Sequence, residues 1–344
     1  MTPAVWPRDE PLEERLLWID PLAGGWEERR VGDLPRLLRA GDLLVVNDAA
    51  TLPASLSGTT SRGERVEIRL AGAGRDETRW TAVAFGEGDW RLPTENRPPP
   101  PPLEAGERLR FGESLVAYVE HVSSVSHRLI DLRFVPGGAA FWEGLYRLGR
   151  PVQYSYLRAP LRLEQVQTRY GARPWAVEPP SAGRPLQLTM LRELAREDVA
   201  LASVTHAAGL SATGEPGLDA ALPLPERFDI PRETVESIAR ARARGGRVVA
   251  VGTTVVRALE GSAALHAGRL AEGEGVTDLR LGPGFRPKVV HGLLTGIHEP
   301  GTSHYALLEA FVAPATLAAA TRHAEQAGYL THEFGDGMLV LERS

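Results

Sequence analysis

The sequence of 344 residues contains no cysteine. Disulfides, thiolate nucleophiles and cysteine-based zinc sites are therefore excluded, and any metal would need histidine and carboxylate ligands. Long apolar stretches are also missing, because no window approaches the roughly 20 consecutive apolar residues of a membrane helix. Residues 6–10 include charged side chains where a signal peptide would have an apolar run. We therefore expect a cytoplasmic protein that has no membrane partner and holds no metal.

Lysine is almost absent, since Lys288 is the only one and arginine supplies the other cations. A single lysine in an arginine-rich chain indicates a position that needs a compact ammonium, although chance is an equal alternative. The formal net charge is -5 at pH 7. This charge argues against a general nucleic-acid coat protein, because sequence-independent affinity comes from cations that neutralise phosphates. It does not exclude a local basic face.

The length and composition predict about two domains with a sizeable core, since 43% of the residues are hydrophobic and 24% charged. Residues 52–135 form short alternating runs between glycine-rich or charged turns, a pattern typical of a small β-barrel or sandwich. We therefore predict a mixed α/β body made of residues 1–51 and 150–344. Residues 52–149 are predicted to form an inserted, barrel-like β-rich domain.

Helices and buried strands alternate on both sides of this insertion, as expected for an α/β body. Short apolar runs predict strands at residues 43–46, 199–204 and 247–251. Amphipathic stretches with suitable end signals predict helices at residues 188–196 and 231–244.

The most informative motif is an apolar strand that leads through Gly252, Thr253 and Thr254 into a helix. This arrangement places free backbone N–H groups and two hydroxyls at the carboxyl end of a strand, where α/β sheets bind ligands. Arg257 follows near the first turn, where a cation opposes the helix dipole. Its position indicates a negative partner, which is either an anionic ligand group or Glu260 on the next turn.

Three polar residues of the C-terminal part lie near strand ends, because glycine and proline punctuate the chain around Asp278, Lys288 and His298. His298 precedes a helix for which Thr302 or Ser303 is the expected N-cap.

Two further signals each have two interpretations. His291, His298 and His304 suggest a metal site, but their spacing matches no helix face and no zinc pattern, so we disfavour it. Asp336 lies between two glycines, which fits either a ligand site or an ordinary hairpin turn.

Taken in order, these motifs resemble the S-adenosylmethionine:tRNA ribosyltransferase-isomerase family. The resembling segments are Asn47-Asp48 with Pro53-Ala54, Gln167-Thr168 with Tyr170, Gly252 to Thr254 with Arg257 and Glu260, Thr277-Asp278 with Pro283 to Phe285, Lys288 to Val290 with Gly292 to Thr295 and His298, and Gly335-Asp336 with Met338-Leu339. The resemblance extends over nearly the whole chain and implies an α/β body with an inserted β-barrel. It also implies transfer of the ribosyl part of S-adenosylmethionine onto 7-aminomethyl-7-deazaguanine in a tRNA anticodon. The products are epoxyqueuosine, adenine and methionine.

Several positions depart from the family pattern. Gln187 replaces a family histidine, and a neutral amide cannot shuttle protons as an imidazole can. His206 lies one position before the place of another histidine, and a shift of one position on a strand reverses the face. Of a third motif that contains two histidines, only Glu226 is kept, while Ala50 and Ser55 replace two arginines. These losses indicate altered chemistry or an altered acceptor.

The implied reaction gives roles to the retained groups. A sulfonium acidifies the adjacent ribose carbon, so a base forms an ylide that opens the sugar and expels adenine, and an amine then captures the fragment. The protein must bind the methionine carboxylate, supply the base and exclude water. We expect Glu226 or Asp278 to be the base and His298 to transfer a proton. The expected cofactor-binding residues are Asn47, Asp48, Gly252, Thr253, Thr254, Arg257, Lys288 and Asp336.

The expected partners are S-adenosylmethionine as co-substrate and tRNA, and the expected state is a monomer. Arg240, Arg244 and Arg247 are candidate phosphate contacts, although a helix C-terminus also favours cations through its dipole. Two alternatives stay open. One is a paralogue that uses S-adenosylmethionine on a small-molecule acceptor or cleaves it, and the other is a catalytically silent RNA-binding relative.

Overall fold

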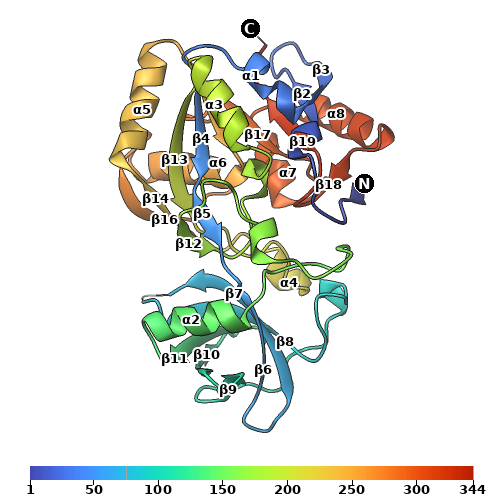
Figure 1. The fold of residues 1–344 in the computed structure, drawn as a ribbon, viewed down its shortest axis with the longest axis vertical. Helices are drawn as coiled ribbons and strands as arrows, with labels where there is room; N and C mark the ends of the chain where they lie inside the picture. The colour runs from blue at the N-terminus through green and yellow to red at the C-terminus, as the bar shows by residue number, and fades with distance from the viewer. Residues whose placement is uncertain (75, 344) are drawn as a thin grey trace.

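The chain forms two adjoining units, an α/β body and a closed β-barrel, in a computed structural model that describes residues 1–74 and 76–343 (Figure 1). The fold class predicted from the sequence is confirmed, because the barrel strands all lie between residues 55 and 135 and the body sheet uses strands from both sides of this range. The domain boundaries at residues 52 and 149 stay a prediction. No helix of the described residues is long and apolar enough to cross a membrane.

The barrel is built from antiparallel strands in the order β10-β11-β8-β7-β6-β9. Its strands are β6 (Ser55–Thr59), β7 (Arg65–Ala73), β8 (Arg79–Phe85), β9 (Arg108–Phe111), β10 (Leu115–Val122) and β11 (Leu129–Val135). The helix α2 (Ala139–Leu148) covers it and buries Phe141 against Phe134, with ring centroids 5.2 Å apart. Alternating inward side chains therefore give the barrel a core of its own.

The body sheet has the strand order β16-β14-β13-β4-β15-β17-β19-β2-β3. Its strands are β2 (Arg15–Ile19), β3 (Trp26–Arg30), β4 (Leu43–Asn47), β13 (Ala200–His206), β14 (Glu226–Ile230), β15 (Val248–Val251), β16 (Gly273–Thr277), β17 (Gly292–Gly296) and β19 (Gly337–Val340). The central strands β13, β4, β15 and β17 run parallel. Their carboxyl ends therefore meet at one edge, the carboxyl edge.

Helices cover both faces of this sheet, which explains why residues 43–46 of β4 are all apolar. Leu43 and Val45 pack on one face with α5 (Arg232–Ala243), α6 (Thr253–Leu265), α7 (Ser303–Leu308) and α8 (Pro314–Gln326). Leu44 and Val46 pack on the other face with α1 (Leu34–Leu37) and α3 (Leu188–Arg196). Strands buried on both faces lose the polar alternation of half-exposed strands.

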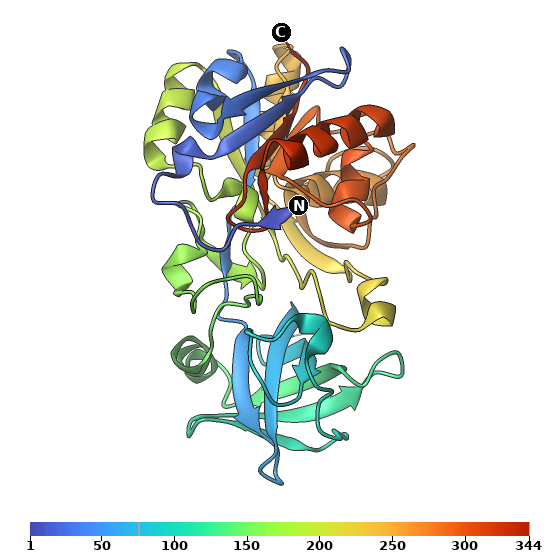
Figure 2. The same ribbon diagram turned by 90° about the vertical axis from the view of Figure 1, so that its right-hand side faces the viewer.

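The segments that join body and barrel pass between the two units (Figures 1 and 2). They contain β5 (Ala49–Thr51), β12 (Arg173–Ala176) and α4 (Pro216–Asp219). A further small pair joins the two ends of the chain, because β1 (Thr2–Pro3) runs parallel to β18 (Leu330–Thr331). The carboxyl edge of the body sheet faces the barrel, because β4 leads from this edge toward the barrel in Figure 1. The connecting segments therefore lie over this edge.

The helix predictions agree with the structure. The helices α3 and α5 occupy the two predicted stretches to within one residue at each end. Thr302, one of the two expected N-caps before α7, accepts a hydrogen bond from the Tyr305 N–H at 3.2 Å.

Candidate active site at the carboxyl edge

Most of the residues expected in a site lie at the carboxyl edge. Asn47 ends β4, His206 ends β13, Gly252 follows β15 directly, and His298 comes shortly after β17. Because these strands are parallel neighbours, residues far apart in the sequence are gathered within one region.

The side chain of Asn47 connects three segments at this edge by hydrogen bonds. Its side-chain N–H donates to the His206 carbonyl at 3.0 Å and to Thr254 Oγ1 at 3.3 Å. Its Oδ1 accepts the backbone N–H of His206 at 2.9 Å. Asp48, the next residue, accepts the hydroxyls of Ser203 and Thr205 at 2.9 and 2.6 Å. Both residues lie at the expected edge, and their polar atoms hold β4, β13 and α6 in place.

The turn into α6 depends on Gly252. Its φ of 95° and ψ of 151° form a backbone conformation that is essentially restricted to glycine. Its N–H donates to the Leu294 carbonyl at 2.7 Å, and no side chain caps the helix. Thr253 is buried and Thr254 half-buried. The first N–H groups of α6 are therefore available to an anion.

A buried ion pair forms the centre of the cluster. Arg257 donates to the carboxylate of Glu226 through Nη1 and to the Leu279 carbonyl through Nε at 3.3 Å. The Gly209 N–H donates to Glu226 Oε1 at 2.9 Å. Glu226 and Arg257 are only 8% and 7% exposed, and Arg257 Nη2 is buried without a partner. This guanidinium thus has one donor nitrogen left for a ligand.

The alternative prediction that Arg257 pairs with Glu260 is wrong. The carboxylate of Glu260 instead accepts the backbone N–H groups of Lys288, Val289 and Val290, each at 2.9 Å. The sequence predicted a negative partner for Arg257, and the structure shows that this partner is Glu226.

Burial governs the ionisation of this centre. It raises the pKa of the Glu226 carboxyl and lowers that of Arg257, and the opposite charge of each residue offsets part of the other's shift. The imidazole of His206 has its Nε2 3.3 Å from Glu226 Oε2, without hydrogen-bond geometry. Burial and then the charge of Arg257 lower the pKa of His206 to about 3, so this ring is neutral near pH 7.

A second group of imidazoles lies beside the ion pair. His298 and His304 stack with ring centroids 5.1 Å apart and an angle of 15°. Thr295 Oγ1 lies 2.8 Å from Nε2 of His298. Burial, followed by the charges of His304 and His332, lowers the pKa of His298 well below its usual value. His298, expected as a proton-transfer residue, is therefore a neutral ring held in a fixed orientation.

Sequence reasoning missed five further polar residues in the same region: Tyr154, Tyr156, Glu178, His332 and Glu333. Tyr154 donates to the carboxylate of Glu178, and Tyr156 donates to Glu333 at 2.7 and 2.5 Å. The two tyrosine rings stack 6.0 Å apart. The negative charge of Glu178 contributes to the raised pKa of Glu226. The only available sequence signal was the pair of tyrosines two residues apart.

Asp278 is brought to the carboxyl edge but is exposed. It follows β16, whose Thr277 pairs with Glu226, and its charge raises the pKa of Arg257 slightly. Of the two candidate bases, only Glu226 is therefore buried against the guanidinium.

Lys288 is not brought to this cluster. It precedes β17 and so lies at the opposite, amino edge of the sheet, and it is exposed. A Cβ on Gly268, beyond the C-terminal end of α6, would lie 2.7 Å from its Nζ. His291 also lies at this amino end of β17, where Nδ1 accepts the Val248 N–H at 3.1 Å, so it is separated from His298.

Asp336 is occupied by contacts within the protein. Its carboxylate accepts hydrogen bonds from Arg8 at 2.6 Å and from the backbone N–H groups of Arg15 and Leu330 at 3.0 and 2.8 Å. The expectation that Asp336 binds the cofactor is thus not supported, and its side chain ties the two ends of the chain together.

The proposed basic stripe is also corrected. Arg247 is buried, and its Nη2 donates to Asp42 at 2.6 Å, so it offers no face to phosphates. Arg240 near the end of α5 and its C-cap residue Arg244 are exposed, at the amino edge of the sheet. The three arginines therefore do not form one surface.

Ser55, which stands where the family pattern has an arginine, lies beside a buried cluster of charged residues in the barrel. Ser55 on β6 pairs directly with Arg69 on β7. Both residues contact Glu67 Oε1, Ser55 at 3.0 Å and Arg69 at 2.8 Å, and Arg97 binds the other oxygen. The carboxylate of Glu67 is thus paired with two guanidiniums, that of Arg69 on its own strand and that of Arg97.

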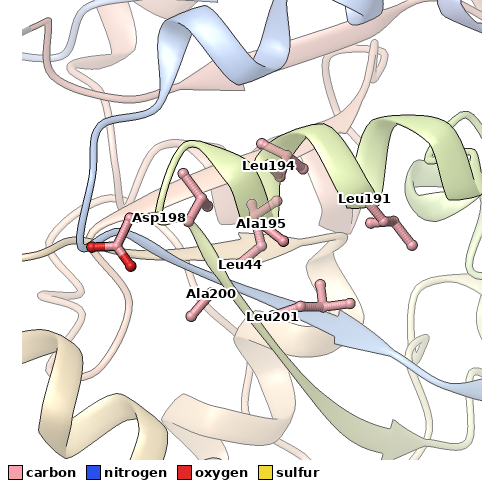
Figure 3. A pocket seen from close by; sticks show the side chains of 8 residues that line it. Leu44, Leu191, Leu194, Ala195, Asp198, Ala200 and Leu201 are labelled. Atoms are coloured by element: carbon pink, nitrogen blue, oxygen red, sulfur yellow. The ribbon is translucent and has the colours of Figure 1, made fainter.

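Two cavities lie near the body sheet. One of about 240 Å³ lies between α3 and the first residues of β4 and β13, at the amino edge (Figure 3). Its walls are mainly leucine and alanine side chains, and Asp198 is the charged residue among those that line it. A smaller cavity between barrel and body is lined by Ala71, Val83, Gly209, Leu210, Thr213, Leu222, Leu224 and Glu226. The carboxylate of Glu226 therefore faces the junction of the two units.

Comparison with known proteins identifies the family. The profile of the family described as "Queuosine biosynthesis protein" matches residues 2–340. The chain belongs to this family. The S-adenosylmethionine:tRNA ribosyltransferase-isomerase of Gloeobacter violaceus is 37% identical over 97% of this chain and 90% of its own length. That of Acidithiobacillus ferrooxidans is 34% identical over 97% of this chain and 93% of its own.

One solved structure matches the fold of this chain over nearly its whole length. The S-adenosylmethionine tRNA ribosyltransferase of Thermotoga maritima is 26% identical, with a TM-score of 0.53, and the match covers 99% of this chain and 96% of that one. The family membership predicted from the sequence motifs is thus confirmed.

Proposed function

We propose that this chain is an S-adenosylmethionine-dependent ribosyltransferase-isomerase that modifies 7-aminomethyl-7-deazaguanine in tRNA, giving epoxyqueuosine. The observation that carries the proposal is the buried Glu226–Arg257 pair at the carboxyl edge, in a chain that belongs to the queuosine family. The pair combines a base with an unused donor nitrogen, which this reaction requires.

The cofactor would be held by its methionine carboxylate. Arg257 Nη2 and the N–H groups of Thr253 and Thr254 in the first turn of α6 are the donors available to it, and Gly252 shapes the turn that presents them. Asn47 at the end of β4 supports this turn through Thr254, and the next residue, Asp48, is held by Ser203 and Thr205 of β13. The proposed cofactor site therefore omits Lys288 and Asp336, which lie elsewhere.

Glu226 is the proposed base that removes a proton from the ribose carbon next to the sulfonium. Its raised pKa makes it a stronger base than an exposed glutamate. The positive charge of Arg257 opposes this rise and so favours the ionised form of the carboxylate. His298 is the proposed proton-transfer partner, and the exposed Asp278 is the less favoured base. The body, residues 1–51 and 150–344, would carry the chemistry, and residues 52–149 would form the inserted domain.

A paralogue that acts on a small molecule is the second candidate. The observation in its favour is Gln187, whose amide contacts the Arg184 carbonyl at 3.3 Å and Arg169 Nε at 3.1 Å. This neutral side chain transfers no proton at a position where the family pattern has histidine.

Mass spectrometry of the reaction products tests both candidates. Purified protein is incubated with S-adenosylmethionine, with and without tRNA that carries 7-aminomethyl-7-deazaguanine. We expect adenine and methionine only with this tRNA, together with the matching mass gain on the base. Release without tRNA would favour the paralogue, and no release in either reaction would contradict both.

A further inference from the structure

The stacked imidazole of His304 is a polar group that the proposed reaction has not yet used. His304 is the second residue of α7, and Thr302 caps this helix, so the backbone of His304 is fixed. Its ring lies parallel to that of His298, which is itself held at Nε2 by Thr295. Two rings that follow β17 are thus stacked at the carboxyl edge, near enough to Arg257 for its charge to act on His304.

His304 is neutral near pH 7. Burial and then the charge of Arg257 lower its pKa to about 4. The N-terminus of a helix also disfavours a cation, because its N–H groups carry partial positive charge. The pKa values of the other two histidines in this region, His298 and His332, are lowered as well. A neutral imidazole has one ring N–H to donate and stays a donor through the physiological pH range.

The imidazoles expected from the family pattern are missing at this edge. The two family positions hold Gln187 and Ala207, and the neighbouring His206 is fully buried against the ion pair. His298 and His304 are only partly covered, since both rings are of intermediate exposure. The imidazoles that a substrate at the carboxyl edge can reach are therefore those of His298 and His304, together with the exposed His332.

We propose that His304 is a further catalytic residue, whose ring N–H donates a hydrogen bond to adenine as adenine leaves. The inference rests on the function proposed above. When the bond from ribose to adenine breaks, the adenine nitrogen takes the electron pair and becomes negative. The proton of His304 stays on its ring, and the proton that Glu226 removed from the sugar neutralises the departing base. A fixed donor aimed at developing charge lowers the barrier because it needs no reorganisation.

Two variants separate the N–H group from the stacked ring. His304→Phe keeps the stack and removes the donor, whereas His304→Gln keeps an N–H donor and loses the aromatic ring. We expect His304→Phe to lower kcat for adenine release about 100- to 1000-fold, with unchanged S-adenosylmethionine affinity by calorimetry. His304→Gln should keep more activity than His304→Phe. His127→Phe, which removes an exposed imidazole from the barrel, is the control and should match the parent protein.

The inference is overturned if His304→Phe keeps the parent kcat, or if His304→Gln is as slow as His304→Phe. Thermal unfolding of each variant shows whether a loss of rate reflects a loss of structure. Adenine release without tRNA would remove the proposed acceptor and leave the test of His304 intact, because adenine departs in either reaction. NMR titration of the imidazoles adds a test that is independent of turnover. A charged His304 at pH 6 would make the ring a possible proton donor to adenine and would overturn the inference of a neutral ring that keeps its proton.

Discussion

At the scale of single residues, burial decides what a charged side chain does. Glu226 and Arg257 were expected as a base and a carboxylate anchor with separate tasks, but they contact each other away from water. Desolvation of two charges offsets much of their attraction, so such a pair contributes little net stability, whereas loss of one partner leaves a buried, unpaired charge. The pair is thus better explained by the reaction than by folding.

Arg257→Leu tests this explanation. We expect the free energy of unfolding to fall by about 3–5 kcal/mol, because the carboxylate of Glu226 loses its counter-ion in a buried site. The double variant Glu226→Leu with Arg257→Leu should recover most of this loss and stay inactive in adenine release. Urea unfolding measures the stability of both variants. A double variant as unstable as the two single losses added together would contradict a pair retained for function.

At the scale of elements, the strand-to-helix turn at Gly252 is the most constrained local feature. A Cβ there would meet only Thr254 Oγ1 at 3.5 Å and the Ala182 Cβ at 3.6 Å, which are ordinary contacts. The requirement for glycine therefore comes from the backbone conformation and not from crowding. This turn sets the direction of the first N–H groups of α6.

Gly252→Ala should accordingly weaken both stability and cofactor binding. We expect a loss of about 1–3 kcal/mol in the free energy of unfolding and at least a measurable rise in the Kd for S-adenosylmethionine. Gly245→Ala is the matched control, because Gly245 also has a positive φ, of 74°, and lies in open space beyond α5. The control should lose stability and keep its Kd in calorimetry. An equal Kd in both variants would argue against anion binding at α6.

At the scale of the whole molecule, the two ends of the chain stabilise one another. The strand β1 pairs with β18, and Asp336 receives Arg8 and the Arg15 N–H across more than 300 positions of sequence. These contacts place the N-terminal segment beside β19, on which β2 continues the body sheet. The carboxylate of Asp336 therefore holds the two ends of the chain together.

Asp336→Asn separates this structural role from cofactor binding. The substitution removes the charge that pairs with Arg8 and keeps the shape of the side chain, so we expect a loss of about 1–3 kcal/mol in unfolding free energy. The affinity for S-adenosylmethionine should not change. Unaltered stability together with a large rise in Kd would restore the original interpretation of Asp336 as a ligand residue.

The sequence by itself determined the family and the α/β body with its inserted barrel, and it predicted a ligand site at the carboxyl end of a strand. These features follow from local signals: apolar runs, hydrophobic periodicity, helix ends and motifs such as the turn at Gly252. The residues at the ends of parallel strands could be grouped because parallel strands end at the same edge.

Only the tertiary structure decided which charges meet. Arg257 lies three positions from Glu260 in sequence, yet it binds Glu226, because α6 packs that face toward β14. Lys288 lies at the opposite edge of the sheet from His298 although ten residues of sequence separate them, because β17 runs between the two. Side-chain pairing depends on packing between distant segments, and the sequence pattern of one segment does not contain its partner.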